Sequence, residues 1–78
     1  MRMAASRGRP SYLVKGPELT QARLRRAMGL GEAAEAIGVT RSALSRAETG
    51  GPVRLDTLRT VARFYGLDPG TLIVGEAA

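Results

Sequence analysis

Apolar residues recur at helical spacing through most of the chain, and Gly or Pro interrupts the pattern at short intervals. This pattern is typical of short amphipathic helices joined by tight turns. It predicts helices at residues 17–27, 30–37, 41–48, 55–65 and 68–72. Gly29 and Gly31 open the second helix, and Gly38 stops it because glycine tolerates a positive φ.

Two runs near the ends of this helical region have the apolar and β-branched character of strands. They are Tyr12-Leu13-Val14, which a turn signal follows, and Leu72-Ile73-Val74. The two runs could pair as a short ribbon, or either could pair with a second chain, and the pattern leaves both open. We therefore expect an all-α fold of five compact helices over residues 12–78, with a ribbon from residues 12–14 and 72–74 as a candidate addition.

Residues 1–11 differ in composition from the rest of the chain. They contain Gly, Ser, Pro and three arginines, Arg2, Arg7 and Arg9, but no acid. They offer little apolar surface that could anchor a core, so we expect a flexible basic arm.

The absence of Cys and His narrows the functions open to a chain of 78 residues. Without Cys there are no disulfides, iron–sulfur clusters or thiolate zinc sites, and without His the commonest general base is missing. Seven acidic residues on so short a chain leave little room for a catalytic cleft. We expect a protein that is not an enzyme and that uses no cofactor, metal or small-molecule ligand.

The net charge of +5 indicates a polyanionic partner. All but one of the 12 basic residues are Arg, whose planar guanidinium suits bidentate recognition of phosphate and guanine. No apolar run reaches the ~18 residues that span a bilayer, and the first residues lack the apolar stretch of a secretory signal. We expect a cytoplasmic, nucleoid-associated protein that binds double-stranded DNA and no membrane.

The most informative stretch is residues 30–49, where two short helices are joined by the turn Gly38-Val39-Thr40. The small side chain of Ala34 faces this turn and lets the two helices cross closely. Thr40 is expected to cap the second of these helices, on which Leu44 points inward. The outer arc of that helix is cationic and free of acids, and it spans roughly 140° on a helical wheel. Its members are Arg41, Ser42, Ser45 and Arg46.

This stretch resembles the helix-turn-helix of the phage-repressor and Cro-like family, also called the xenobiotic-response-element type. Ala34, Gly38, Leu44 and the Glu-Thr-Gly exit at residues 48–50 stand at the family's spacing, and the resemblance extends from about Gly16 to Leu72. It implies a lambda-repressor-like domain that binds a palindromic operator as a homodimer. It also implies a transcriptional regulator of a phage, plasmid or bacterial genome, acting as a repressor. Two recognition helices would then stand about 34 Å apart, one turn of DNA.

The resemblance also assigns roles to residues. The helix at 41–48 would lie in the major groove. The expected base-reading residues are Arg41, Ser42, Ser45 and Arg46, and the expected DNA-backbone contacts are Gly29, Leu30, Gly31, Thr40 and Arg54. Gly29 and Leu30 replace the family's usual Ser or Thr followed by Gln, so backbone N–H groups alone would hold a phosphate there. A structural ion pair is implied between Arg23 and Glu48.

The arm contains a second motif, Arg7-Gly8-Arg9-Pro10. It resembles the core of the AT-hook, in which Gly lets the backbone sit deep in the minor groove and two Arg lie along its floor. Narrow A·T-rich minor grooves have an enhanced negative potential that attracts Arg. We expect Arg7, Gly8 and Arg9 to enter the minor groove beside the recognition helix.

Several other surface residues are open to interpretation. Leu24 and Phe64 fall off the inner stripes of their helices, and the candidate dimer contact is Phe64 with Leu72, Ile73 and Val74. Four further arginines are interpreted as a solvated face: Arg25, Arg26, Arg59 and Arg63. Glu32 and Glu35 are expected on the outer side of the second helix, pointing away from DNA phosphate.

Three other functions would use the same residues differently. An antitoxin-type autoregulator would also bind a protein partner, and only the arm and the last few residues are spare for that purpose. A protein-interaction module on the same fold would present a neutral or acidic recognition face. A membrane-surface binder would need a large apolar face beside its cations.

Overall fold

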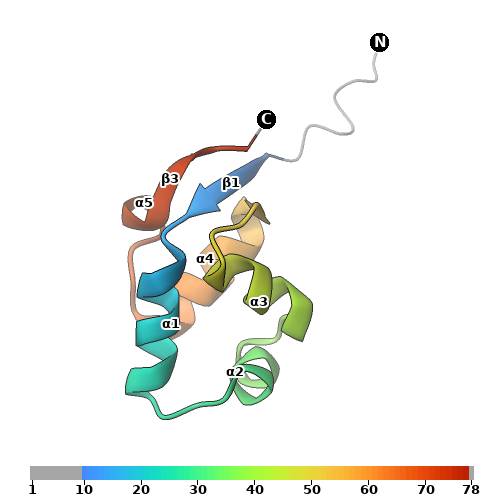
Figure 1. The fold of residues 1–78 in the computed structure, drawn as a ribbon, viewed down its shortest axis with the longest axis vertical. Helices are drawn as coiled ribbons and strands as arrows, with labels where there is room; N and C mark the ends of the chain where they lie inside the picture. Colours follow the sequence, from blue (N-terminus) through green and yellow to red (C-terminus); the bar gives the residue numbers. More distant parts are fainter. Residues whose placement is uncertain (1–9, 78) are drawn as a thin grey trace.

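The computed structural model describes residues 10–77, which form five helices and a small sheet (Figure 1). In chain order the elements are β1 (Ser11–Val14), α1 (Gly16–Arg25), α2 (Leu30–Ile37), α3 (Arg41–Glu48), β2 (Val53–Arg54), α4 (Leu55–Tyr65), α5 (Pro69–Leu72) and β3 (Ile73–Glu76). The bounds of α3 and α4 agree with those predicted from the sequence. α1 ends two residues earlier than predicted because Ala27 has a φ of 55°, outside the helical range.

The sheet shows that the expected all-α class is only roughly right. β1 lies in the centre and pairs antiparallel with β2 on one side and β3 on the other. The ribbon between the two ends of the domain is present, but its second strand begins at Ile73 instead of Leu72. β2 was not predicted, because two residues are too short to show a periodic pattern. β1 begins at Ser11, so the expected boundary between arm and domain falls one residue inside the sheet.

The core lies mainly among the helices, and the sheet adds Val14 and Val53 to it. Its largest fully buried side chains come from four different helices: Leu19, Leu44, Leu58, Val61 and Leu72. Each such burial contributes roughly 1.5–3 kcal/mol relative to an exposed side chain. Leu44 belongs to α3, so the inner face of that helix is held in the core while its outer face stays in solvent.

Figure 1 shows the sheet at one end of the molecule and α2 at the other, with α3 between them on one side. None of the helices within residues 10–77 combines the length and the apolar content needed to cross a bilayer. The same part of the chain contains no cluster of acidic side chains arranged to hold a metal ion.

Candidate nucleic-acid interface

The turn between α2 and α3 depends on the conformation of Gly38, which has a φ of 94°. The N–H groups of Gly38 and Val39 both donate to the carbonyl of Ala34, at 2.9 and 3.0 Å. Residues with a Cβ rarely adopt this φ, so glycine at this position lets α2 end and the chain turn into α3 within three residues. Ala34 is buried beneath the turn, as expected for a small residue that lets two helices cross closely.

α3 starts with a side-chain cap, as the sequence predicts. Thr40 Oγ1 accepts a hydrogen bond from Ala43 N at 3.0 Å. Such a cap contributes about 1 kcal/mol to helix stability. Thr40 is exposed, and its hydroxyl still has a proton to donate to a partner.

The outer face of α3 is exposed and cationic, as predicted. Arg41, Ser42 and Arg46 are exposed and Ser45 is half-buried, whereas Leu44 and Ala47 are buried on the opposite face. The four outer residues line one hollow together with Leu30, Thr49 and Gly51. The hollow has no acid among its described lining residues. Half-buried Leu30 thus borders this hollow while it also packs against the core.

Arg54 lies beside α3 although it belongs to the next segment of the chain. It occupies the N-cap position of α4 and is exposed. A groove between α3, β2 and α4 is lined by Arg46 and Arg54 together with Ala43 and Thr57. The fold thus places Arg54, at which the sequence predicts a contact with the DNA backbone, next to the outer face of α3.

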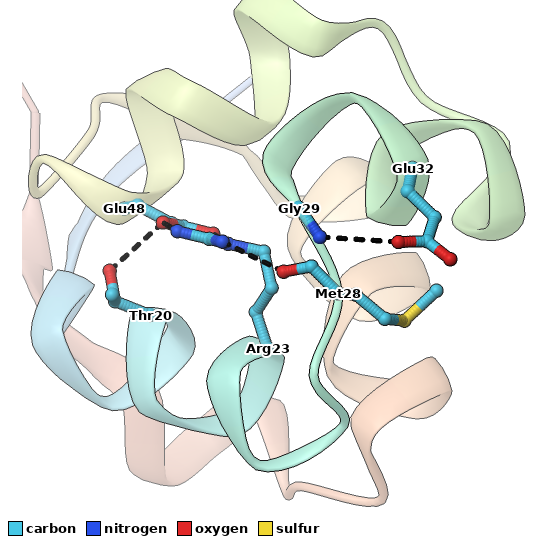
Figure 2. A network of polar contacts seen from close by, with 6 residues as sticks. All are labelled: Thr20, Arg23, Met28, Gly29, Glu32 and Glu48. Atoms are coloured by element: carbon cyan, nitrogen blue, oxygen red, sulfur yellow. Dashed lines mark hydrogen bonds and ion pairs between the residues drawn. The ribbon is translucent and has the colours of Figure 1, made fainter.

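The N-terminus of α2 is held by the side chain of Glu32. Its Oε1 accepts a hydrogen bond from Gly29 N at 3.3 Å (Figure 2). Carboxylates are favourable at helix N-termini because the free N–H groups there carry partial positive charge. The Gly29 N–H expected to hold a phosphate is therefore already bound to an anionic side chain, which leaves Leu30 and Gly31 as the candidate backbone donors.

The C-terminal end of α3 is joined to α1 by an ion pair, as the resemblance implied. Arg23 donates to both Glu48 carboxylate oxygens, from Nε at 2.7 Å and from Nη2 at 2.9 Å. The side chains of Arg23 and Glu48 are only 14% and 8% exposed. Hydrogen bonding to Glu48 raises the pKa of Arg23, so the Arg23 guanidinium stays protonated.

Two further groups complete this network (Figure 2). Thr20 Oγ1 donates to Glu48 Oε1 at 3.0 Å, and Arg23 Nη1 donates to the Met28 carbonyl at 3.0 Å. The network therefore joins α1, the end of α3 and the segment that leads into α2. Sequence reasoning missed Thr20, although its position three residues before Arg23 places both on one face of α1.

A glycine allows α1 to approach α3 this closely. A Cβ on buried Gly16 would overlap the Glu48 carbonyl oxygen and lie 2.9 Å from Gly50 N. Val14 N also donates to Gly50 O at 2.9 Å. The chain just before α1 and the chain just after α3 thus pack backbone against backbone.

The candidate dimer contact is corrected at one position. Leu72 is fully buried in the core of the single chain, so it cannot contact a second chain.

The other candidate dimer residues are at least partly accessible. Phe64 is half-buried, and the Arg26 guanidinium lies 5.1 Å from the Phe64 ring centroid and 5.7 Å from that of Tyr65. Burial raises the pKa of Tyr65, and the nearby Glu48 carboxylate adds to this effect. Ile73 is half-buried and Val74 is 64% exposed. Arg7, Gly8 and Arg9 lie outside the described residues.

A family model described as a helix-turn-helix domain matches residues 16–73. The chain belongs to the helix-turn-helix domain family. Among solved structures, this helix-turn-helix domain is similar to the crystal structure of transcriptional regulator VanUg, Form II, at 27% sequence identity and a TM-score of 0.62. That similarity covers 81% of this chain and 84% of the other. Among curated proteins, none matches the sequence.

Proposed function

We propose that this helix-turn-helix domain is a sequence-specific regulator of transcription of the phage-repressor and Cro-like type, which represses by occupying its operator. In this proposal α3 lies in the major groove of double-stranded DNA. The outer face of α3 carries the proposal, because it presents two arginines and two serines around a hollow without a lining acid. The similarity to a transcriptional regulator supports it. A cationic face also argues against a module that binds only proteins.

The individual roles follow from side-chain chemistry. Arg41 and Arg46 bind guanine O6 and N7 in a bidentate manner, each with about 1–3 kcal/mol of discrimination. Ser42 and Ser45 bind base edges or phosphates. Thr40 donates its hydroxyl proton to a phosphate, and Arg54 and the N–H groups of Leu30 and Gly31 bind the DNA backbone.

The arm has a place in the same proposal. Ser11 pairs with Arg54 across the β-ladder, so the chain that follows the arm lies beside a candidate backbone contact. We propose that Arg7 and Arg9 enter an adjacent A·T-rich minor groove. Deleting residues 1–9, which leaves β1 intact, should weaken binding and reduce its dependence on salt. An unchanged salt dependence would show that the arm does not contact the DNA.

We also propose that the protein binds a two-fold-symmetric operator as a homodimer. Within the described residues no strand lies along the outer edge of β3, and exposed Val74 is on that strand beside half-buried Ile73. Sedimentation should show that Val74→Glu lowers the association state. The matched control is Leu24→Glu, at a 59% exposed leucine on α1. If both variants sediment like the parent protein, this surface is not the dimer contact.

The deciding experiment is selection of bound sites from random double-stranded DNA, followed by affinity measurements on the selected site. A two-fold-symmetric consensus is expected. Arg46→Ala should lose about 1–3 kcal/mol of binding free energy and relax preference at one position. Arg25→Ala, at an exposed arginine on α1, is the control and should retain the preference. No enrichment over random DNA would overturn the proposed function.

A further inference from the structure

The cationic surface does not end at the recognition helix. Arg46 and Arg54 line one groove, Arg54 and Arg59 line a second, and Arg59 and Arg63 line a third. All four are exposed. Arg54, Arg59 and Arg63 thus form a band, called here the α4 band, that continues from α3 along the outside of α4.

The arginines of the α4 band form no ion pair with the acids of the described residues. In residues 10–77 the only ion pair is that between Arg23 and Glu48. The two carboxylates of this region bind backbone instead: Asp56 Oδ1 accepts from Thr57 N at 2.8 Å, and Asp68 Oδ1 accepts from Gly70 N at 3.0 Å. Asp56 lines the groove shared by Arg54 and Arg59, so the band presents three exposed cations and one carboxylate, a surplus of positive charge.

The four arginines first interpreted as a solvated face separate into two kinds. Arg25 Nη2 donates to Gln21 Oε1 at 3.4 Å, and Arg26 lies over the rings of Phe64 and Tyr65. Arg59 and Arg63 have no such contacts among the described residues, and they line the grooves that follow Arg54 along α4. Arg25 and Arg26 are therefore engaged within the chain, whereas Arg59 and Arg63 are available to a partner.

The dimensions of the band suit duplex DNA. Nine residues of helix separate Arg54 from Arg63, which is about 14 Å at 1.5 Å per residue. At 3.4 Å per base pair this length corresponds to about four base pairs. Pro10, at which the described chain begins, lines the groove shared by Arg54 and Arg59. The basic arm thus joins the domain at the same band.

We propose that the α4 band binds phosphates of the DNA that flanks the site read by α3. The inference rests on the proposed function, because it assumes that α3 seats the duplex. It adds a second contact region that contributes affinity without reading sequence, and it assigns a binding role to Arg59 and Arg63.

The test compares two duplexes, one that stops at the ends of the selected site and one that extends a further helical turn on each side. Fluorescence anisotropy over a range of salt concentrations gives the affinity and the salt slope for each. The full chain should bind the long duplex more tightly and with a steeper slope. In the double variant Arg59→Gln/Arg63→Gln, the slope on the long duplex should fall by up to about 1.8, or ~0.9 for each lost phosphate contact. Its affinity for the short duplex should stay close to that of the parent protein.

The matched control is Lys15→Gln/Arg25→Gln, which removes two exposed cations outside the band. It should preserve the difference between the duplexes. The proposal is overturned if the parent protein binds both duplexes equally, or if the α4 double variant and the control behave alike. If either result occurs while mutation of Arg46 still abolishes the preference for the selected site, the proposed function stands and only the binding role of the α4 band is excluded.

Discussion

The two ends of α3 are held in different ways. The N-terminal end has one side-chain cap, Thr40, and a tight turn at Gly38, and both residues are exposed. The C-terminal end is held by the network around Glu48 and by the backbone packing at Gly16. One end depends on local hydrogen bonds, and the other on contacts with a distant part of the chain.

This difference indicates that different parts of α3 serve stability and DNA binding. An eight-residue helix is too short to be stable alone, so its position must come from tertiary contacts. Those contacts gather at the C-terminal end and on the inner face of α3. The N-terminal cap and the outer face, from Arg41 to Arg46, present the groups proposed to bind DNA. Substitutions at the two ends should therefore separate stability from affinity.

The largest effect is expected from Glu48→Ala, which leaves the Arg23 guanidinium partly buried without its partner. We expect a loss of about 3 kcal/mol in the free energy of unfolding, measured by urea denaturation. Glu35→Ala, at an exposed acid on α2, is the control and should change it by less than about 0.5 kcal/mol. A loss below about 1 kcal/mol at Glu48 would mean that the network does not hold the C-terminal end.

Gly16→Ala should follow, because its Cβ would meet the backbone of Glu48 and Gly50, which cannot rotate away as a side chain could. We expect a loss of about 1–3 kcal/mol in the free energy of unfolding. Gly31→Ala is the matched control, since nothing lies within 4 Å of its Cβ position and alanine favours a helix. If both substitutions stabilise the protein, the close approach of α1 to α3 is not a constraint.

Thr40→Ala tests the other end and should cost about 1 kcal/mol of unfolding free energy. Its loss of DNA affinity should exceed what the loss of stability explains, because the same hydroxyl is proposed to donate to a phosphate. Thr40→Ser keeps the cap and should retain both properties. If Thr40→Ala lowers the free energy of unfolding as much as Glu48→Ala, the two ends of α3 do not differ in their contribution to stability.

The smallest effect is expected at the start of α2. Glu32→Gln keeps an acceptor for Gly29 N and removes a negative charge from a helix end where phosphate is proposed to bind. We expect DNA affinity to rise by about 0.3–1 kcal/mol, with the increase shrinking at high salt. Glu35→Gln removes the same charge one turn away. An equal rise in both variants would show an effect of net charge rather than of position.

The sequence by itself determined the helices, the turn and the sides of α3. Gly38, Thr40 and the spacing of Leu44 from the outer arginines act within a few residues, so their consequences are readable from local chemistry. The pair Arg23–Glu48 was readable only through the resemblance, because nothing in the spacing of two residues 25 positions apart predicts contact.

Only the tertiary structure decided which distant residues meet. It placed Leu72 in the core and paired two-residue β2 with β1. It brought Gly16 against the carbonyl of Glu48 and placed Arg54 beside Arg46 of α3. These arrangements depend on the packing of whole elements around one core. Local patterns fix the faces of each element but not which faces come together.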